Sequence, residues 1–418
     1  MLLKIGGDKV IVGYDLGNDL CQISYGYAKE GSIVETLSSV AGQEIYDIPA
    51  VLCKRVGINQ WFFGKEALRY MEENEGGGIL VDRLLEAALD GEDIQLEGIA
   101  YQPVSLLTLF VKRSLGLLTS VTSIDRVTEM MITCDDLTPK MLEVLNQVVD
   151  GLQLKNTRVY YQNYAESMYS YMLYQPRELW EFRAVLFDYR AKGLLRCLSM
   201  ECNRRTSPVV TYVQEETYNF AGQDRELLSI ARKICGAGRV SAFYLLGERF
   251  GGGWMEESLK YLCQGRRVFQ GSNLYSKGAC CWLLEKQFGS EVGKEYVFLG
   301  SDKLKANIGM RVLNRGEETY FALLDAGTNW YEAEYTCDLY LKGENDVELS
   351  ITPLIDAGGS TVKITLDGLN IEQNDMVRIR MKLWMLAEAR MCAEFWDLGM
   401  GEFRAATDQH WREEIDIY

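Results

Sequence analysis

The sequence predicts an α/β fold in two successive blocks, followed by a C-terminal antiparallel β domain. The first block opens with β-type segments joined by short turns over residues 10–37, and helices follow them. A second strand-rich block begins at Ala184–Asp188. From about residue 297, apolar residues recur at every second position and helical spacing disappears. We therefore expect domains at 1–183, 184–296 and 297–418, the last an antiparallel β-sandwich.

The elements of the first block are predicted from turn residues, apolar spacing and helix start signals. Asp15–Asp19 is rich in turn-forming residues and separates the first two strands. The pair Thr138-Pro139 is a helix start signal, which makes Asp135 and Asp136 an acidic pair at a helix N-terminus. The expected strands are Val10–Tyr14, Cys21–Tyr27, Ile33–Leu37, Arg126–Thr133 and Arg158–Gln162, and the expected helices are Lys65–Glu72, Val104–Leu118, Asp135–Asp150 and Tyr164–Leu173.

The same signals define the second block and the β domain. In the second block the expected strands are Ala184–Asp188, Leu194–Met200, Pro208–Val213, Ala242–Leu246 and Arg267–Phe269. The expected helices there are Asp224–Ile234, Met255–Leu262 and Leu274–Phe288. In the β domain the expected strands are Glu334–Leu341, Asp346–Pro353, Thr361–Leu366, Val377–Met385 and Arg390–Trp396.

Charge and composition argue against several classes of function. The chain has 418 residues and a formal net charge of −16, which repels nucleic-acid phosphates and anionic lipid headgroups. No apolar run reaches the ~18 residues that suggest a membrane span. The N-terminus carries no signal-peptide pattern. We expect a cytoplasmic protein without a nucleic-acid or membrane partner.

Metal chemistry based on cysteine or histidine is not expected. The 11 cysteines are scattered without a Cys-x-x-Cys pair, and the single histidine is His410, near the C-terminus. A zinc site and histidine-based acid–base catalysis therefore lack their residues. Any chemistry would depend on carboxylates, lysines, a bound metal ion or backbone dipoles.

Three short motifs follow one another in an informative order. Val12–Gly17 is a strand that ends in Asp-x-Gly at a hairpin, and Val185–Asp188 is a strand that ends in aspartate. Phe243–Gly247 is a strand that ends in glycine before a helix. Two strand-end aspartates facing one cleft can orient a hydrated magnesium ion. Hairpin amides can cradle phosphate oxygens, and a glycine lets a base approach the backbone.

Together these motifs resemble those of the actin/Hsp70/sugar-kinase superfamily, where they form the two phosphate loops and the adenosine motif. Gln162–Ser167 is similar to the connecting helix of Hsp70, and Asn273–Ala279 to the helix that ends its ATPase domain. The resemblance is loose but covers nearly the whole chain, and bacterial Hsp70-like proteins of uncharacterised function fit it best. It implies two actin-like, RNase H-like ATPase-fold domains, the second reduced. The C-terminal β-sandwich is similar to the Hsp70 substrate-binding β domain.

The resemblance also implies a nucleotide site with a magnesium ion. Asp15 and Asp188 would hold the ion through water, and Asp188 would be the catalytic residue if the protein is active. The cofactors would be ATP or ADP with magnesium, or there would be none. The residues that correspond to nucleotide-binding positions are Asp15, Gly17, Asn18, Asp19, Glu166, Asp188, Arg190, Lys192, Gly247 and Glu248.

Several departures from the family pattern fall in this cleft. Where Hsp70 has Asp-Leu-Gly-Gly-Gly-Thr, this chain has the sequence 188–193, Asp-Tyr-Arg-Ala-Lys-Gly. Arg190 and Lys192 either hold an anion by charge or lie in a solvated turn. Asp19 would place a carboxylate beside a phosphate, and Glu248 replaces the second glycine of the adenosine motif. The segment 189–246 is far shorter than in Hsp70, so the lobe that closes over ribose and adenine is missing.

Three functions are compatible with these features. The preferred one is an Hsp70-like binding protein with a degenerate, non-hydrolysing cleft, which presents its β domain to a peptide or protein partner. The second is a nucleotide-dependent ATPase or switch, and the third is a structural scaffold without a ligand. The tyrosine-rich segment Tyr160–Tyr174 is expected to pack a domain interface rather than to stack on a ligand.

Overall fold

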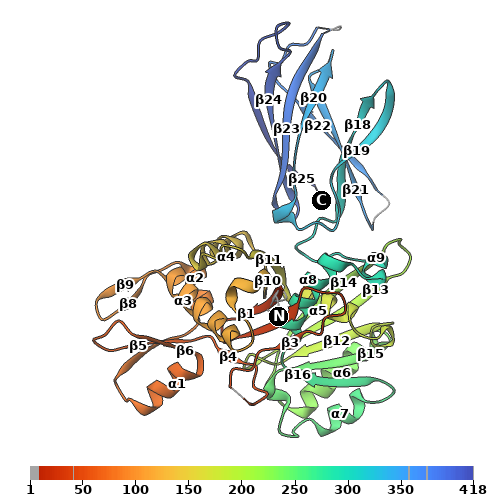
Figure 1. Cartoon of the computed structure of the whole chain (residues 1–418). Helices are drawn as coiled ribbons and strands as arrows, with labels where there is room; N and C mark the ends of the chain where they lie inside the picture. Colours follow the sequence, from red (N-terminus) through yellow and green to blue (C-terminus); the bar gives the residue numbers. More distant parts are fainter. Residues whose placement is uncertain (1–8, 41, 356–357, 373–374, 418) are drawn as a thin grey trace, which may run out of the picture. The chain divides into compact units, whose positions relative to one another are not determined.

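The computed structural model describes residues 9–40, 42–355, 358–372 and 375–417. The chain divides into two compact units, Met1–Tyr296 and Val297–Tyr418 (Figure 1). Residues 1–8, in which the sequence lacks a signal-peptide pattern, lie outside the described part. Over the described residues, no helix is both long enough and apolar enough to cross a bilayer.

The first half of the first unit is a mixed β-sheet with helices. β1 lies at its centre, pairs antiparallel with β2 and parallel with β10, and gives the order β11-β10-β1-β2-β3. β1 is buried along its whole length, as expected of a central strand covered on both faces. The strands are β1 (Val10–Leu16), β2 (Leu20–Tyr27), β3 (Glu35–Thr36), β10 (Val127–Cys134) and β11 (Arg158–Asn163), and the helices are α3 (Pro103–Leu115), α4 (Pro139–Leu152) and α5 (Tyr164–Leu173).

The second half of this unit is built in the same way around β12. β12 pairs antiparallel with β13 and parallel with β15, and the sheet contains the order β16-β15-β12-β13-β14. The strands are β12 (Arg183–Asp188), β13 (Leu194–Asn203), β14 (Val209–Asn219), β15 (Val240–Leu246) and β16 (Arg267–Gly271). The helices are α6 (Asp224–Gly236), α7 (Glu256–Leu262), α8 (Leu274–Phe288) and α9 (Glu291–Glu295), and β17 (Tyr296–Phe298) follows them.

The two halves repeat one topology. In each half the second and third strands are antiparallel additions on one side of the first strand, and the fourth and fifth are parallel additions on the other. A helix follows the third, fourth and fifth strands in both halves. The halves differ where the third strand leads into its helix, because residues 37–102 intervene in the first half and only 220–223 in the second.

The long insertion of the first half carries small elements of its own. β4 adds to the main sheet by pairing with β2, while β5 pairs with both β6 and β7, and β8 forms a hairpin with β9. The elements of the insertion are β4 (Ile48–Pro49), β5 (Leu52–Arg55), β6 (Trp61–Phe63), α1 (Gly64–Glu73), β7 (Gly78–Val81), α2 (Leu84–Asp90), β8 (Ile94–Leu96) and β9 (Ile99–Tyr101).

Two glycines allow α8 to pack very closely against α5 and against β1. A Cβ atom on Gly278 of α8 would lie 1.9 Å from the carbonyl oxygen of Ser167 on α5. A Cβ atom on Gly13 of β1 would lie 2.1 Å from the carbonyl oxygen of Ser276 on α8. Glycine is required at both positions because any side chain would collide with backbone. The second half is thereby joined to the first sheet through α8.

The second unit consists of two four-stranded antiparallel sheets over its described residues. Their orders are β19-β18-β21-β22 and β20-β23-β24-β25. In β23 every second residue from Val377 to Met385 is buried, which is the pattern of a sheet with one face on a core. The strands are β18 (Ala306–Asn314), β19 (Glu317–Leu324), β20 (Glu334–Lys342), β21 (Asp346–Pro353), β22 (Ser360–Thr365), β23 (Met376–Ala387), β24 (Arg390–Gly399) and β25 (His410–Asp416).

The α/β class with a C-terminal antiparallel β region is confirmed, but several predicted boundaries are wrong. The strand expected at Pro208–Val213 continues to Asn219, and the strand expected at Ile33–Leu37 is only Glu35–Thr36. The helix expected at Asp135–Asp150 begins only at Pro139, where Thr138 caps it by accepting from the amide of Met141 at 3.1 Å. A proline favours the first helical turn and disfavours a helical conformation in the residue before it. Asp135 is therefore not part of the helix.

Candidate functional site

The two strand-end aspartates lie at equivalent ends of the two central strands. Asp15 is the next-to-last residue of β1 and Asp188 is the last residue of β12. Asp15 is completely buried, and Asp188 retains 8% of its exposure. A carboxylate at this depth needs a compensating charge or hydrogen-bond donors.

Arg190 supplies that compensation from the loop that follows β12. Its Nη1 donates to Asp15 Oδ2 at 2.7 Å, and its Nε donates to Asp188 Oδ1 at 3.1 Å and Oδ2 at 3.2 Å. Only 11% of the Arg190 side chain is exposed. Arg190 therefore joins the two halves of the unit, and it is neither solvated nor directed outward toward an anion.

Two stacked tyrosines complete the enclosure of this arginine. The rings of Tyr164 and Tyr275 lie 4.1 Å apart and within 9° of parallel. The Arg190 guanidinium carbon lies 4.9 Å and 4.6 Å from their respective centroids, a distance typical of cation–π contacts. Tyr164 Oη donates to Asp15 Oδ1 at 2.8 Å, and Tyr275 Oη donates to Asp188 Oδ2 at 3.2 Å.

The electrostatics of the cluster follow from its burial. Burial raises the pKa of Asp15, although the Arg190 guanidinium opposes this effect. The adjacent carboxylates hold the pKa of Arg190 well above its usual value despite burial. Burial also raises the pKa of Tyr164 and Tyr275, so both remain protonated donors. We call Asp15, Asp188, Arg190, Tyr164 and Tyr275 the cleft cluster.

A second arginine lies beside this cluster. Arg196 on β13 forms an ion pair with Asp135 and another with Glu215 at 2.9 Å. Its guanidinium carbon lies 5.6 Å from the ring centroid of Tyr164. Asp135 thus connects the first half to the second instead of standing at a helix N-terminus.

The two loop amides expected to cradle phosphate oxygens donate hydrogen bonds to other groups of the protein. The amide of Gly17 donates to the carbonyl of Leu20 at 3.1 Å and closes the β1–β2 hairpin. The amide of Arg190 donates to Asp188 Oδ1 at 3.0 Å. Both hydrogen bonds would have to break before these two amides could bind a phosphate oxygen.

The residues of the first loop also make contacts elsewhere in the protein. Asn18 is exposed, and its Oδ1 accepts from the amide of Glu86 at 2.9 Å, in the first turn of α2. Asp19 is exposed, and its carbonyl accepts from the amide of Ala50 at 2.9 Å. Both residues therefore connect the β1–β2 hairpin by hydrogen bonds to the insertion at residues 37–102.

The glycine expected to receive the base is covered by the second loop. Gly247 has φ of 114°, and a Cβ there would lie 3.1 Å from the carbonyl oxygen of Tyr189 and 3.2 Å from Cγ of Arg190. Glu248 and Lys192 are exposed. The space beside Gly247 that a base would need is therefore occupied by Tyr189 and Arg190.

Glu166 joins the two final helices. It is 3% exposed, and its Oε1 accepts from Trp282 Nε1 of α8 at 2.9 Å. Over the described residues, no group of three or more His, Cys, Asp or Glu side chains is arranged to hold a metal ion. Asp15 and Asp188 would have to exchange Arg190 for a hydrated ion to bind magnesium.

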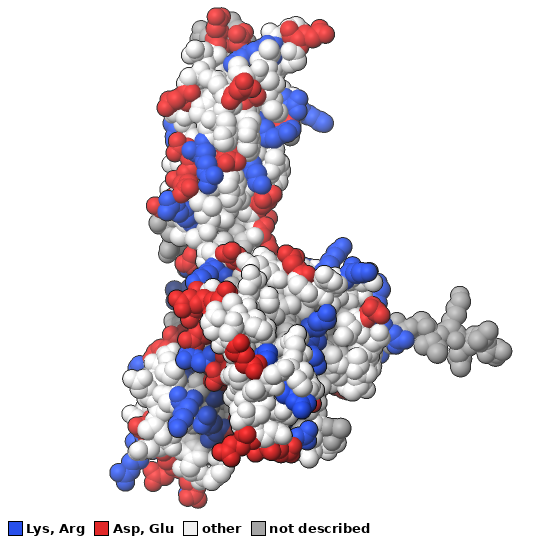
Figure 2. Space-filling view, turned by 90° about the vertical axis from the view of Figure 1, so that its left-hand side faces the viewer, with Lys and Arg blue, Asp and Glu red and all other residues white. Residues whose placement is uncertain are grey.

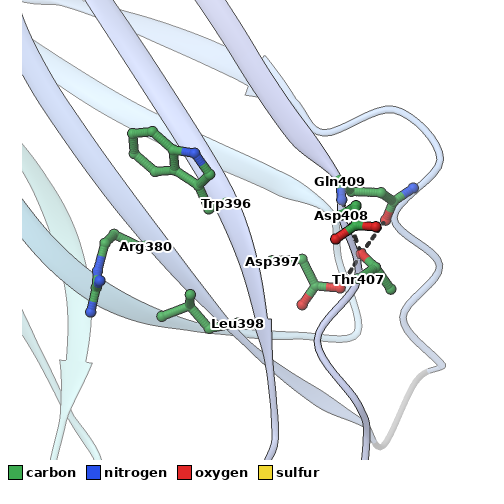
Figure 3. Close-up of a pocket in the computed structure, with 7 residues that line it drawn as sticks. All are labelled: Arg380, Trp396, Asp397, Leu398, Thr407, Asp408 and Gln409. Carbon is green, nitrogen blue, oxygen red and sulfur yellow. Dashed lines mark hydrogen bonds between the residues drawn. The ribbon is translucent and has the colours of Figure 1, made fainter.

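The second unit has a pocket of its own beside β24 (Figure 3). Its volume is about 560 Å³, within the range of small-ligand and side-chain sites. Asp397 is buried and accepts from Thr407 Oγ1 at 2.7 Å and from the amide of Gly399 at 2.8 Å. The residues that line the pocket are Arg380, Trp396, Asp397, Leu398, Thr407, Asp408 and Gln409.

Comparison with protein families identifies the first unit. A model described as a family of unknown function (DUF5716), C-terminal, matches residues 33–301. The chain belongs to the DUF5716 family. A second model, for a domain of unknown function (DUF8552), matches residues 303–417, and no curated protein matches the sequence. The two matches adjoin close to the division between the compact units.

In this DUF5716 chain the structure brings together only part of the expected site. Asp15, Asp188 and Arg190 meet directly, and Gly247 lies against Arg190. Sequence reasoning missed Tyr164 and Tyr275 as partners of the cleft carboxylates, and it missed Arg196, which lies beside the cluster. The tyrosine-rich segment was an available signal, but Tyr275 lies far along the chain from both aspartates.

Proposed function

We propose that this DUF5716 protein is a cytoplasmic, Hsp70-like binding protein of the actin-like fold with a degenerate nucleotide cleft. The cleft neither binds nor hydrolyses ATP, and the C-terminal β-sandwich is presented to a peptide or protein partner. The observation that carries the first part of this proposal is the position of Arg190, which pairs with Asp15 and Asp188 at once.

The repeated topology supports an actin-like assignment. Both halves have the strand order five-four-one-two-three, and each places an aspartate at the end of its first strand. The final helices α5 and α8 contact each other closely at Ser167 and Gly278. Duplicated sheets of this order with a cleft between them are what the resemblance implies for the ATPase fold.

The charge distribution argues against a magnesium nucleotide in this cleft. Arg190 places a buried positive charge where the resemblance would place the metal ion. At about 4 Å and an effective dielectric constant near 20, a divalent cation and a guanidinium repel by about 8 kcal/mol. Binding would therefore require Arg190 to leave both carboxylates first.

The exposed face of the second unit supports a protein partner. Asp338, Arg380, Trp396 and His410 form one row across β20, β23, β24 and β25. Arg380 Nε donates to Asp338 Oδ1 at 2.9 Å, and the Trp396 and His410 rings stack at 5.1 Å. Arginine and tryptophan are the side chains most enriched at binding hot spots. This row borders the pocket of Figure 3.

The distribution of charge on the surface is compatible with a protein partner. On the face drawn in Figure 2, acidic and basic side chains are interspersed on both units, and no continuous basic stripe is visible among the described residues. Nucleic-acid-binding surfaces are usually marked by a basic patch or stripe.

The partner hypothesis is tested by binding the full chain to an array of extended peptides. We expect a subset of peptides to be retained, and retention to fall at least about tenfold in the double variant Arg380→Ala, Trp396→Ala, because aromatic and arginine anchors dominate such contacts. Arg311→Ala, an exposed residue of the other sheet, is the control.

Each contrary result selects an alternative function. Release of bound peptides by MgATP would favour the nucleotide-dependent switch over the non-hydrolysing binding protein. If no peptide were retained above background, peptide binding would be overturned. The remaining function would be the structural scaffold without a ligand. Equal retention by the wild type and the double variant would overturn the assignment of binding to this face.

A further inference from the structure

A second cavity lies in the first unit, at the end of β12 opposite to the cleft cluster. Arg183 begins β12 and Asp188 ends it, so the two sites are about 16 Å apart along the strand. The cavity has a volume of about 430 Å³ and is bordered by the start of β12, the end of β13 and the turn between α6 and β15. Its lining includes three arginines, Arg183, Arg204 and Arg239.

Arg183 forms hydrogen bonds and an ion pair within the wall of the cavity. Its Nη2 donates to the carbonyls of Ile234 at 2.6 Å and Gly238 at 2.8 Å, at the C-terminal end of α6. Its Nη1 lies 3.5 Å from a carboxylate oxygen of Glu201. The carbonyls at a helix C-terminus would repel an anion, and Arg183 covers them.

Arg204 and Arg239 are held in place but keep their charge uncompensated. Arg204 Nη2 donates to the backbone carbonyl of Glu181 at 2.6 Å. The Arg239 guanidinium carbon lies 3.8 Å from the ring centroid of Phe182. Among the described residues, no carboxylate lies within 4.0 Å of either guanidinium. A carbonyl and an aromatic ring orient an arginine without neutralising it.

The acidic residues of the cavity do not cancel this charge. Glu201 is engaged by Arg183 and accepts from Tyr212 Oη at 3.2 Å. Glu181 is exposed and contributes its carbonyl to Arg204. The lining thus carries three arginines against two glutamates on a molecule whose net charge is −16.

We infer that this cavity binds a phosphate group, held by the guanidinium groups of Arg204 and Arg239. The planar fork of an arginine matches two oxygens of a phosphate, and two such forks supply donors and charge for a dianion. Phe182 is 38% exposed beside Arg239 and offers an apolar surface to the rest of an organic phosphate. The inference is independent of the state of the cleft cluster and of any peptide partner.

The test is calorimetric titration of the full chain with inorganic phosphate and, separately, with phenyl phosphate, at constant ionic strength. We expect saturable binding, and tighter binding of phenyl phosphate if the natural ligand is an organic phosphate. The double variant Arg204→Ala, Arg239→Ala should lose at least about tenfold in affinity, because both forks are removed. Arg225→Ala, an exposed arginine at the other end of α6, is the matched control.

A conservative variant separates charge from geometry. Arg239→Lys keeps the charge but removes the fork, so we expect intermediate affinity and unchanged far-UV circular dichroism. The inference is overturned if neither phosphate binds saturably to the wild type. It is also overturned if the double variant binds as tightly as the wild type, or if Arg225→Ala weakens binding as much as the double variant does.

Discussion

Replacing Arg190 with alanine should destabilise the first unit by about 3–5 kcal/mol, because removal of one partner leaves buried carboxylates without their cation. Asp15 would lose its contact at 2.7 Å and Asp188 its contacts at 3.1 and 3.2 Å. Only neutral donors would remain: Tyr164 for Asp15, and Tyr275 with the backbone amide of residue 190 for Asp188. Urea unfolding followed by circular dichroism measures the loss.

A charge-balanced variant is the control for this prediction. The triple variant Arg190→Met, Asp15→Asn, Asp188→Asn removes the cation and both charges, and should recover most of the lost stability, because neutral groups cost less to bury than an unpaired charge. If Arg190→Ala were as stable as the wild type, the cleft cluster would not hold the two halves together.

The loss in Arg190→Ala should also depend on pH. Burial already raises the pKa of Asp15, and without Arg190 only the hydrogen bond from Tyr164 opposes that effect. A carboxyl group with a raised folded-state pKa adds stability at low pH and loses it as pH rises through that pKa. The difference between wild type and Arg190→Ala should therefore be smaller near pH 4 than at pH 7.

Replacing Gly278 with alanine should cost about 3 kcal/mol or more, because the added Cβ collides with backbone rather than with a flexible side chain. The nearest atoms are the carbonyl oxygen of Ser167 at 1.9 Å and its carbonyl carbon at 2.7 Å. To accommodate the methyl group, α5 and α8 must separate. The same urea titration measures the change.

Gly236→Ala provides the matched control for this substitution. Gly236 ends α6, and a Cβ atom there would meet nothing within 4 Å. Alanine is favoured over glycine in a helix by up to about 1 kcal/mol, so the control should be neutral or slightly stabilising. A Gly278→Ala variant that matches this control would show that the two helices are not in close contact.

The strands of the second unit show how far local pattern can predict structure. β20 and β21 were predicted almost residue for residue, because their inward residues alternate with outward ones. β19 (Glu317–Leu324) was missed, since its first six residues are all exposed and show no alternation of burial. A strand that pairs without burying a face leaves little periodic signal.

The cleft cluster could be predicted from the sequence only in part. The motifs identified Asp15 and Asp188 as strand-end carboxylates, and the departures from the family pattern pointed to Arg190. That Arg190 lies between the carboxylates depends on how the two halves pack, which no local pattern encodes. Tyr275 could not be found from sequence, because α8 brings it to Asp188 only in the folded chain.

The cleft cluster is held together by the chain's own side chains. The Arg190 guanidinium, which contacts two carboxylates and two tyrosine rings, supplies the positive charge that the buried carboxylates need. Asp15 and Asp188 therefore have a structural role that requires neither a metal ion nor a nucleotide.

The most direct test of the closed cleft is a titration of the wild-type chain with MgATP, with hydrolysis measured on the same sample. The account predicts no saturable binding up to millimolar nucleotide, no turnover above buffer, and no change in either result on Asp188→Asn. Saturable MgATP binding to the wild type that is lost in Asp188→Asn would contradict it.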